Sequence, residues 1–166
     1  MSIKFLKKTF IRFRNPKKLL MILIFLTFLT EGIYLQLRSY HPIKWHSWQD
    51  QTFAKAMKAQ KPIFLSIEDS DCYECMMMER ESFINKEVAN LLNNHFICIK
   101  VSRQEYPEIE EIYKTYVKNS LGMEKWPLNL FLKPTKEPFY GRPYLPKDQF
   151  IKTLKKVIQI WETKKD

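Results

Sequence analysis

The spacing of apolar residues from residue 48 onward predicts an alternation of helices and strands. Four segments repeat apolar positions every three or four residues, which is typical of helices with one buried face. These segments span residues 48–60, 72–93, 106–118 and 147–161. Four short, mostly apolar runs predict buried strands. They span residues 63–67, 96–101, 128–132 and 138–140. The order α, β, α, β, α, β, β, α predicts an α/β fold, in which a central mixed sheet is flanked by helices and the last two strands pair antiparallel.

The same spacing indicates which side of each helix faces the core. On the first helix, Phe53, Ala54 and Met57 fall on one side. On the second and third helices, Met77 and Ile112 occupy inward positions. The sequence therefore predicts that these five side chains are buried.

A different pattern precedes these elements. Residues 1–18 carry seven basic and no acidic residues, and residues 19–30 form an apolar run. A basic stretch followed by such a run is typical of an export signal. As a helix the run would cover about 18 Å, less than the roughly 30 Å of a bilayer core. Extending it over residues 19–37 gives about 28 Å but includes Glu31.

This N-terminal segment has two interpretations, a cleaved signal peptide or an uncleaved signal-anchor helix in the inner membrane. In either case the basic stretch stays in the cytoplasm and the rest of the chain lies outside it. We therefore expect a signal or anchor over residues 1–37, a connector over 38–47 and one folded domain over 48–166. The expected location is the periplasm or another extracytoplasmic compartment.

The composition argues against several classes of function. The net charge is +10, but the N-terminal basic stretch accounts for +7, so the rest of the chain is only mildly basic. It carries no nucleic-acid-binding motif. With only 3 Gly, the chain has no Gly-rich phosphate loop. We expect no nucleic-acid partner and no nucleotide, haem or flavin cofactor.

Two cysteines, Cys72 and Cys75, lie where a predicted strand is followed by a predicted helix. A Cys-x-x-Cys sequence near a βαβ pattern is typical of a redox pair. Free amides and the helix dipole at a helix N-terminus favour the thiolate of Cys72, which makes it the expected nucleophile. Cys75 comes round to the same side of the helix, where it can resolve a mixed disulfide.

Metal binding and a purely structural disulfide are the alternatives for this pair. A disulfide within one turn closes too short a loop to stabilise the fold much. A zinc site needs about four ligands, and Cys98 is the one other cysteine. Met76, Met77 and Met78 follow the pair, and thioether with thiolate suits Cu(I). Consecutive helical residues point about 100° apart, however, so three methionines cannot meet at one ion. We expect no metal, core packing for Met77, and a substrate contact for Met76 or Met78.

Other residues capable of chemistry receive no role from the sequence alone. Cys98 lies within a predicted strand, where cysteine behaves as a small apolar residue. His41, His46 and His95 have no partner at catalytic or ligand spacing. Most X-Pro bonds are trans, and spacing does not decide the isomer of Trp126-Pro127.

Several segments around the cysteines combine into one specific pattern. They are Lys61-Pro-Ile-Phe-Leu-Ser-Ile67, Cys72-x-x-Cys75, Met78-Glu-Arg-Glu-Ser-Phe83, Glu87-Val88, Leu91-Leu92-Asn93, His95-Phe96, Ile99-Lys100-Val101 and Trp126-Pro-Leu128. Over about residues 45–145 the chain resembles the thioredoxin-like domain that opens the large YyaL-type proteins. As a single exported domain it is similar to the DsbH-type periplasmic disulfide reductases. The resemblance implies a thioredoxin-like fold, Cys72 and Cys75 as the redox pair, and Pro127 as a cis-proline facing them. Trp126, Tyr73 and Met76 are expected to join Pro127 in binding substrate.

The cysteine motif departs from the resemblance, because YyaL-type proteins usually carry aromatic and histidine residues between and after the cysteines, whereas here the dipeptide is Tyr73-Glu74 and Met76 follows. Substrate preference is therefore not carried over. Glu74 lies between the cysteines, with Asp69, Asp71 and Glu79 close in sequence. Negative charge disfavours a neighbouring thiolate, so we assign Glu74 to tuning the thiol and expect a reducing couple.

We interpret the chain as an extracytoplasmic thiol-disulfide oxidoreductase that reduces or isomerises protein disulfides. Its expected partners are proteins with disulfides and an unidentified electron donor in the membrane. The alternative is a binding module, such as a redox-inactive chaperone or a Cu(I)-handling protein, that uses the same surface. A third interpretation is an assembly factor whose cysteine pair is inert.

Overall fold

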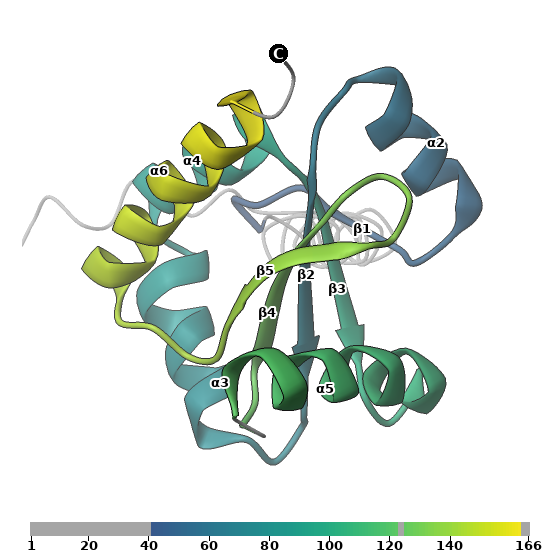
Figure 1. The fold of residues 1–166 in the computed structure, drawn as a ribbon. Coiled ribbons are helices and arrows are strands. Elements are labelled where there is room, and N and C mark those ends of the chain that lie inside the picture. The colour runs from purple at the N-terminus through teal and green to yellow at the C-terminus, as the bar shows by residue number, and fades with distance from the viewer. Residues whose placement is uncertain (1–40, 123–124, 164–166) are drawn as a thin grey trace, which may run out of the picture. The chain divides into compact units, whose positions relative to one another are not determined.

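The computed structural model describes residues 41–122 and 125–163 (Figure 1). The strands are β1 (Trp45–His46), β2 (Ile63–Glu68), β3 (Ile97–Ser102), β4 (Leu128–Leu132) and β5 (Pro138–Arg142). The helices are α2 (Asp50–Lys58), α3 (Tyr73–Met78), the π-helical turn η1 (Glu79–Phe83), α4 (Lys86–His95), α5 (Pro107–Leu121) and α6 (Lys147–Thr163). The signal or anchor expected over residues 1–37 lies outside this part of the chain. Among the described helices, none is both long and apolar enough to cross a membrane.

The sheet is mixed and has the strand order β1-β3-β2-β4-β5. β3 runs parallel to both β1 and β2, and β4 runs antiparallel to both β2 and β5. The α/β alternation, the mixed sheet and the antiparallel last pair are therefore confirmed. β1 is an addition, because Trp45 and His46 belong to the segment expected as a connector and instead pair with Cys98 and Ile99.

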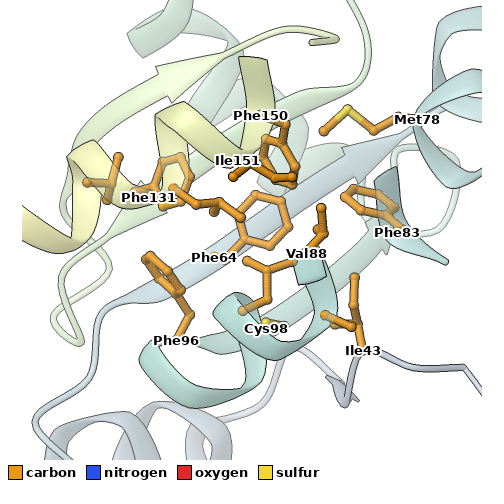
Figure 2. Packing of buried hydrophobic residues seen from close by; sticks show 14 residues of the cluster. Ile43, Phe64, Met78, Phe83, Val88, Phe96, Cys98, Phe131, Phe150 and Ile151 are labelled. Atoms are coloured by element: carbon orange, nitrogen blue, oxygen red, sulfur yellow. The ribbon is translucent and has the colours of Figure 1, made fainter. Parts of the chain in front are cut away.

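Two hydrophobic clusters fill the two faces of the sheet. One contains Phe64 and Phe131 from the sheet with side chains of α3, η1, α4 and α6, and Figure 2 shows Phe64 in the middle of it. The other contains alternate residues of β2 with side chains of α2 and α5. Because side chains alternate along a strand, each face of β2 supplies one cluster. The sheet is thus covered on both sides, as the apolar runs predict.

Some predicted inward positions are wrong. Ala54 and Met57 of α2 are exposed, and Thr52, Phe53 and Ala56 form the buried face. Ile112 is 65% exposed, because α5 packs through its neighbours. Met77 is only half-buried, and Met78 takes the core position. In each case the buried side of the helix is rotated slightly from the side that the apolar spacing predicted.

The single helix predicted over residues 72–93 is three segments. α3 runs directly into η1, and α4 then begins after Asn85. The Asn85 side chain accepts hydrogen bonds from the backbone N–H groups of Glu87 and Val88, at 2.9 and 3.3 Å. Asparagine in this position is a strong helix start, so the chain begins a new helix there.

Candidate functional site

Cys72 and Cys75 lie at the start of α3, just beyond the C-terminal end of β2. They form a disulfide, with the two Cα atoms 5.2 Å apart. Cys72 is the N-cap of α3, and its Sγ accepts a hydrogen bond of 3.0 Å from the backbone N–H of Cys75. Cys72 is half-buried, whereas Cys75 is 5% exposed. A partner from solution can therefore reach Cys72 before Cys75.

A surface pocket of about 270 Å³ opens beside this disulfide. We call it the redox pocket. It is lined by Glu68, Asp69, Ser70, Cys72, Cys75, Met76, Glu79 and Arg80. Of the residues expected to bind substrate, Met76 lines this pocket and is 40% exposed, whereas Tyr73 lies outside its lining and is 68% exposed. Four of the eight lining residues are charged, so the charges around the pocket bear on what the cysteines can do.

A row of polar side chains crosses the sheet beneath α3. Ser66 of β2 pairs in register with Lys100 of β3 and with Asn129 of β4. Ser66 Oγ donates to Asn129 Oδ1 at 3.1 Å, and Asn129 Nδ2 donates to the Met78 sulfur at 3.4 Å. Each of these residues interrupts an otherwise apolar strand, and together they attach α3 to the sheet.

Lys100 joins this row to two carboxylates of the redox pocket. Its Nζ lies 2.6 Å from Glu79 Oε2 and 3.2 Å from Glu68 Oε1. The same ammonium lies 4.8 and 4.9 Å from the ring centres of Trp45 and Phe83, a cation–π arrangement. The charge of Lys100 is therefore enclosed by anionic and aromatic groups.

The two carboxylates respond differently to this environment. Burial raises the pKa of Glu68, and the nearby Lys100 only partly offsets that effect. Burial also acts to raise the pKa of Glu79, but hydrogen bonds and charges from Lys100 and His41 outweigh it and hold that pKa below its usual value. Glu68 is thus the better proton acceptor of the two.

His41, which received no role from the sequence, is the second partner of Glu79. Its Nδ1 accepts hydrogen bonds from the backbone N–H of Ile43 and from the indole N–H of Trp45, both at 3.1 Å. Its Nε2 donates to Glu79 Oε1 at 2.7 Å. The segment before β1 therefore helps to fix Glu79.

Residues 69–72 connect β2 to α3, and we call them the redox loop. On the other side of this loop, Arg103 contacts both Trp126 and Asp69. The Arg103 guanidinium lies 4.3 Å from the centre of the Trp126 ring and 2.8 Å from Asp69 Oδ2. The Trp126–Pro127 peptide bond is cis, and Pro127 directly precedes Leu128, which pairs with Ile67 at the end of β2. Antiparallel pairing thus carries Trp126 and Pro127 to the end of the sheet from which the redox loop leaves.

The structure changes the charge count that was expected around Cys72. Asp69 is paired with Arg103, and a hydrogen bond from the backbone N–H of Asp71, with Arg103 and Gln104, lowers the pKa of Asp69. Glu79 is paired with Lys100. Glu74 and Asp71 form no ion pair with any described residue. Asp69 and Glu79 therefore each have a cationic partner, whereas Glu74 and Asp71 have none among the described residues.

The three methionines after the cysteines lie in different surroundings. Met76 is exposed, Met77 is half-buried and Met78 is fully buried. Within residues 41–122 and 125–163, no three His, Cys, Asp or Glu side chains gather as a metal-binding group. Cys98, as expected, is a free, buried cysteine.

Sequence reasoning missed Lys100, Glu68, Arg103 and His41 at this site. A signal existed for Lys100, which is the one charged residue in the apolar run of residues 96–101. Glu68 is the last residue of β2 and Arg103 follows β3 directly, and at strand ends polar residues are common and carry no distinguishing signal. His41 offered no signal, because only the fold brings it to Glu79.

Comparison with solved structures places the fold among known thioredoxin-like proteins. A DsbH oxidoreductase superposes with a TM-score of 0.54 and 16% sequence identity, covering 70% of this chain and 85% of that chain. A thioredoxin from Thermus thermophilus superposes with a TM-score of 0.57 and 20% identity, covering 69% and 86% of the two chains. At these identities the likeness establishes the thioredoxin-like fold.

Sequence comparison finds longer relatives. The chain is 39% identical to mouse (Mus musculus) spermatogenesis-associated protein 20 over 139 residues, which are 80% of this chain and 18% of that protein. The human (Homo sapiens) protein of the same name is 42% identical over 113 residues, 68% of this chain and 14% of that protein. The chain thus spans less than a fifth of these relatives. Residues 28–166 match the family named Thioredox_DsbH and described as "Protein of unknown function, DUF255". With this match, the fold and the Cys72–Cys75 pair in view, the chain belongs to the Thioredox_DsbH family of thioredoxin-like domains.

Proposed function

We propose that this chain is a thiol-disulfide oxidoreductase that reduces or isomerises protein disulfides outside the cytoplasm. The observation that carries the proposal is the placement of the pair at the start of α3. There the backbone N–H of Cys75 points at the sulfur of an accessible Cys72, while Cys75 itself is buried. Such an arrangement gives the two sulfurs different roles, as thiol-disulfide exchange requires.

The reaction follows from these positions. The Cys72 thiolate attacks one sulfur of a substrate disulfide, forms a mixed disulfide and releases the other sulfur as a thiolate. Cys75 then loses its proton and attacks the Cys72 sulfur, which closes the intramolecular disulfide and releases the second substrate thiolate. Two electrons pass to the substrate. A dithiol electron donor, which we place in the membrane, must return them.

Cys75 needs a proton acceptor within the redox pocket, because it is almost fully buried. We assign this role to Glu68, whose pKa is raised by burial and which lines the pocket with both cysteines. Lys100 and Glu79 position it. Replacing Glu68 with Gln should slow the resolving step on the order of 10²-fold, the usual contribution of a general base. The first attack by Cys72 should keep its rate, and equal slowing of both steps would contradict the assignment.

Trapping tests the proposed function directly. In a Cys75→Ser variant, the mixed disulfide between Cys72 and a substrate cannot be resolved, so covalent adducts should accumulate on non-reducing gels and vanish with dithiothreitol. The matched control is the Cys72→Ser, Cys75→Ser double variant, which retains only buried Cys98. Absence of adducts from the single variant would favour a binding module or an inert pair.

The direction of the reaction rests on Glu74 and Asp71, the nearby carboxylates without an ion-pair partner in the described part of the chain. Their charge disfavours the Cys72 thiolate and makes the pair more reducing. Equilibration with glutathione measures the potential, and a value near −120 mV, that of a strong oxidant, would refute the reducing role. A Glu74→Gln variant should be more oxidising. The matched control is Glu162→Gln. Glu162 lines a pocket with Pro62, at the opposite end of β2 from the cysteines, so this variant should keep the wild-type potential.

The proposed location rests on the basic and apolar segments before residue 38. Alkaline phosphatase, which is active only where its disulfides form, can be joined to the C-terminus of the full chain. We expect phosphatase activity from this fusion and none after deletion of residues 1–37. Activity that survives the deletion would exclude this segment as the export signal.

A further inference from the structure

The redox pocket adjoins a second pocket that the exchange chemistry does not use. This second pocket has a volume of about 500 Å³ and is lined by Arg80, Glu81, Ile84, Asn85, Lys86 and Glu87. Arg80 lines both pockets and forms their shared wall. A chain bound at Cys72 that runs past Arg80 therefore reaches the second pocket, beside η1 and the start of α4.

The path between the two pockets carries a regular set of exposed side chains. Met76 of α3, Arg80 of η1 and Ile84, the residue after η1, follow one another at four-residue steps, so they lie on nearly the same side of this continuous helical segment. Met76 is 40% exposed and Ile84 is 56% exposed. We call Met76, Arg80 and Ile84 the stripe. It begins in the redox pocket and presents an apolar, a basic and a second apolar side chain in that order.

Two basic residues line the second pocket, and one of them, Arg80, belongs to the stripe. The side chains of Arg80 and Lys86 form no hydrogen bond or ion pair with any residue in the described part of the chain. By contrast, Lys100 and Arg103 are each paired with two carboxylates. Of the acidic groups in the second pocket, Glu87 pairs with Lys155, whereas Glu81 accepts a hydrogen bond from the neutral Tyr144 hydroxyl and keeps its charge. The second pocket therefore presents Arg80 and Lys86 to a ligand beside one anion, Glu81.

We propose that this stripe binds an extended segment of the substrate protein that carries an acidic and an apolar side chain near its reactive cysteine. The inference rests on the proposed function and specifies its substrate class. At about 1.5 Å of rise per residue, Met76 and Ile84 are about 12 Å apart, which an extended chain covers in about four residues. The acidic residue belongs at Arg80, about two positions from the residue on Met76. The apolar residue belongs at Ile84, about two positions further.

Matched peptides test this specificity. Cys72 precedes Met76 by four helical residues, about 6 Å, which an extended chain covers in about two residues. Each peptide therefore carries one cysteine in a disulfide with a small uncharged thiol, with Ala two positions away, Glu or Lys four positions away and Leu or Ser six positions away, on either side of the cysteine. The rate of reduction by the reduced full chain is measured for each peptide. The variable residues lie before the cysteine in one series and after it in the other, and only one series matches the direction of the bound segment. In that series we expect reduction of the Glu peptide to be about threefold faster than that of the Lys peptide, as for an exposed ion pair.

Variants assign this preference to the stripe. Arg80→Glu should reverse the Glu over Lys preference, and Ile84→Ser should remove the Leu over Ser preference alone. Lys58→Glu, an equal charge change at an exposed position of α2, should keep both preferences. Rates that change by one common factor for all peptides in the Arg80→Glu variant, or no charge preference in the wild type, would overturn the inference.

A disulfide without flanking residues tests the proposed thiol-disulfide exchange separately from binding at the stripe. Dithiodiethanol, a small disulfide that contains no amino-acid residue, reports the cysteine chemistry alone. If the wild type reduces it and all peptides at equal rates, the stripe is refuted and the redox function stands. If the wild type reduces neither dithiodiethanol nor any peptide, the proposed function fails and the stripe fails with it.

Discussion

Lys100 holds two carboxylates of the redox pocket, so a Lys100→Met variant tests how much this ion-pair group stabilises the fold. Methionine keeps most of the apolar length of the side chain but removes the charge. Glu68 and Glu79 then lose the ammonium at 3.2 and 2.6 Å. His41 still donates to Glu79, but Glu68 retains only Ser66 Oγ at 3.4 Å, whose single proton is shared with Asn129 Oδ1 at 3.1 Å.

The expected loss of stability lies between two known limits. The Lys100, Glu68 and Glu79 side chains are 25%, 21% and 33% exposed, so they are neither surface groups nor fully buried. Exposed pairs contribute about 0–1 kcal/mol, whereas breaking a buried pair costs about 3–5 kcal/mol. We expect about 2 kcal/mol, with up to about 1 kcal/mol more from the contacts with Trp45 and Phe83. For a domain of this size the melting temperature should fall by about 6–12 °C.

The loss should also depend on pH. In the wild type the pKa of Glu79 is lowered, so its contribution to stability is present above the unfolded-state pKa and is lost as the pH falls through the folded-state pKa. In the variant, burial without Lys100 raises the pKa of both carboxyls. The folded variant then gains relative stability as the pH falls through those raised values. The difference between the two proteins should be largest near pH 7 and smaller near pH 4.

Urea unfolding at pH 7 and pH 4 measures both quantities. The matched control is Lys133→Met, which removes a lysine 2.8 Å from Glu137 where the two side chains are 40% and 62% exposed. We expect that control to lose less than about 0.5 kcal/mol at either pH. A Lys100→Met deficit that is equal at both pH values would show that packing, rather than charge, accounts for the loss.

Three further predictions concern other parts of the domain. Replacing Asn85 with Ala should cost about 1 kcal/mol in urea unfolding, because α4 loses its N-cap, whereas Ala at exposed Asn90 of the same helix should not. Phe64→Ala should cost about 3–5 kcal/mol, and a loss below 1 kcal/mol would contradict its central place in the core. In the folded, reduced protein, iodoacetamide should modify Cys72 and spare Cys98, since Cys98 is 1% exposed and burial raises its pKa. Mass spectrometry that finds Cys98 labelled without unfolding would refute its burial.

The sequence was sufficient for the order of elements, because each strand is a short apolar run and each helix has a clear apolar spacing. It was insufficient for the helix faces. Met77 and Met78 are equally apolar neighbours, and only contact with Asn129 and the sheet selects Met78 for the core. β1 was missed since a two-residue strand has no period of its own.

The cysteine pair could be recognised from sequence because both of its members lie within four residues. The groups around it could not, since their neighbourhood depends on strand register. Ser66, Lys100 and Asn129 come from three strands, and pairing alone brings them into one row. His41 reaches Glu79 across 38 positions. Local patterns carry no information about such contacts.

β2 is hydrogen-bonded on both sides, to β3 from Ile63 to Glu68 and to β4 from Ile63 to Ile67. An amide in such a strand exchanges with solvent deuterium only when the whole domain opens, whereas the edge strand β1 can open alone. The redox loop begins where β2 ends, so it is attached to the slowest-exchanging part of the domain. Fluctuations that fray the edges of the sheet therefore leave the N-terminal side of the Cys72 loop in place, and thiol exchange does not have to wait for the edges to close.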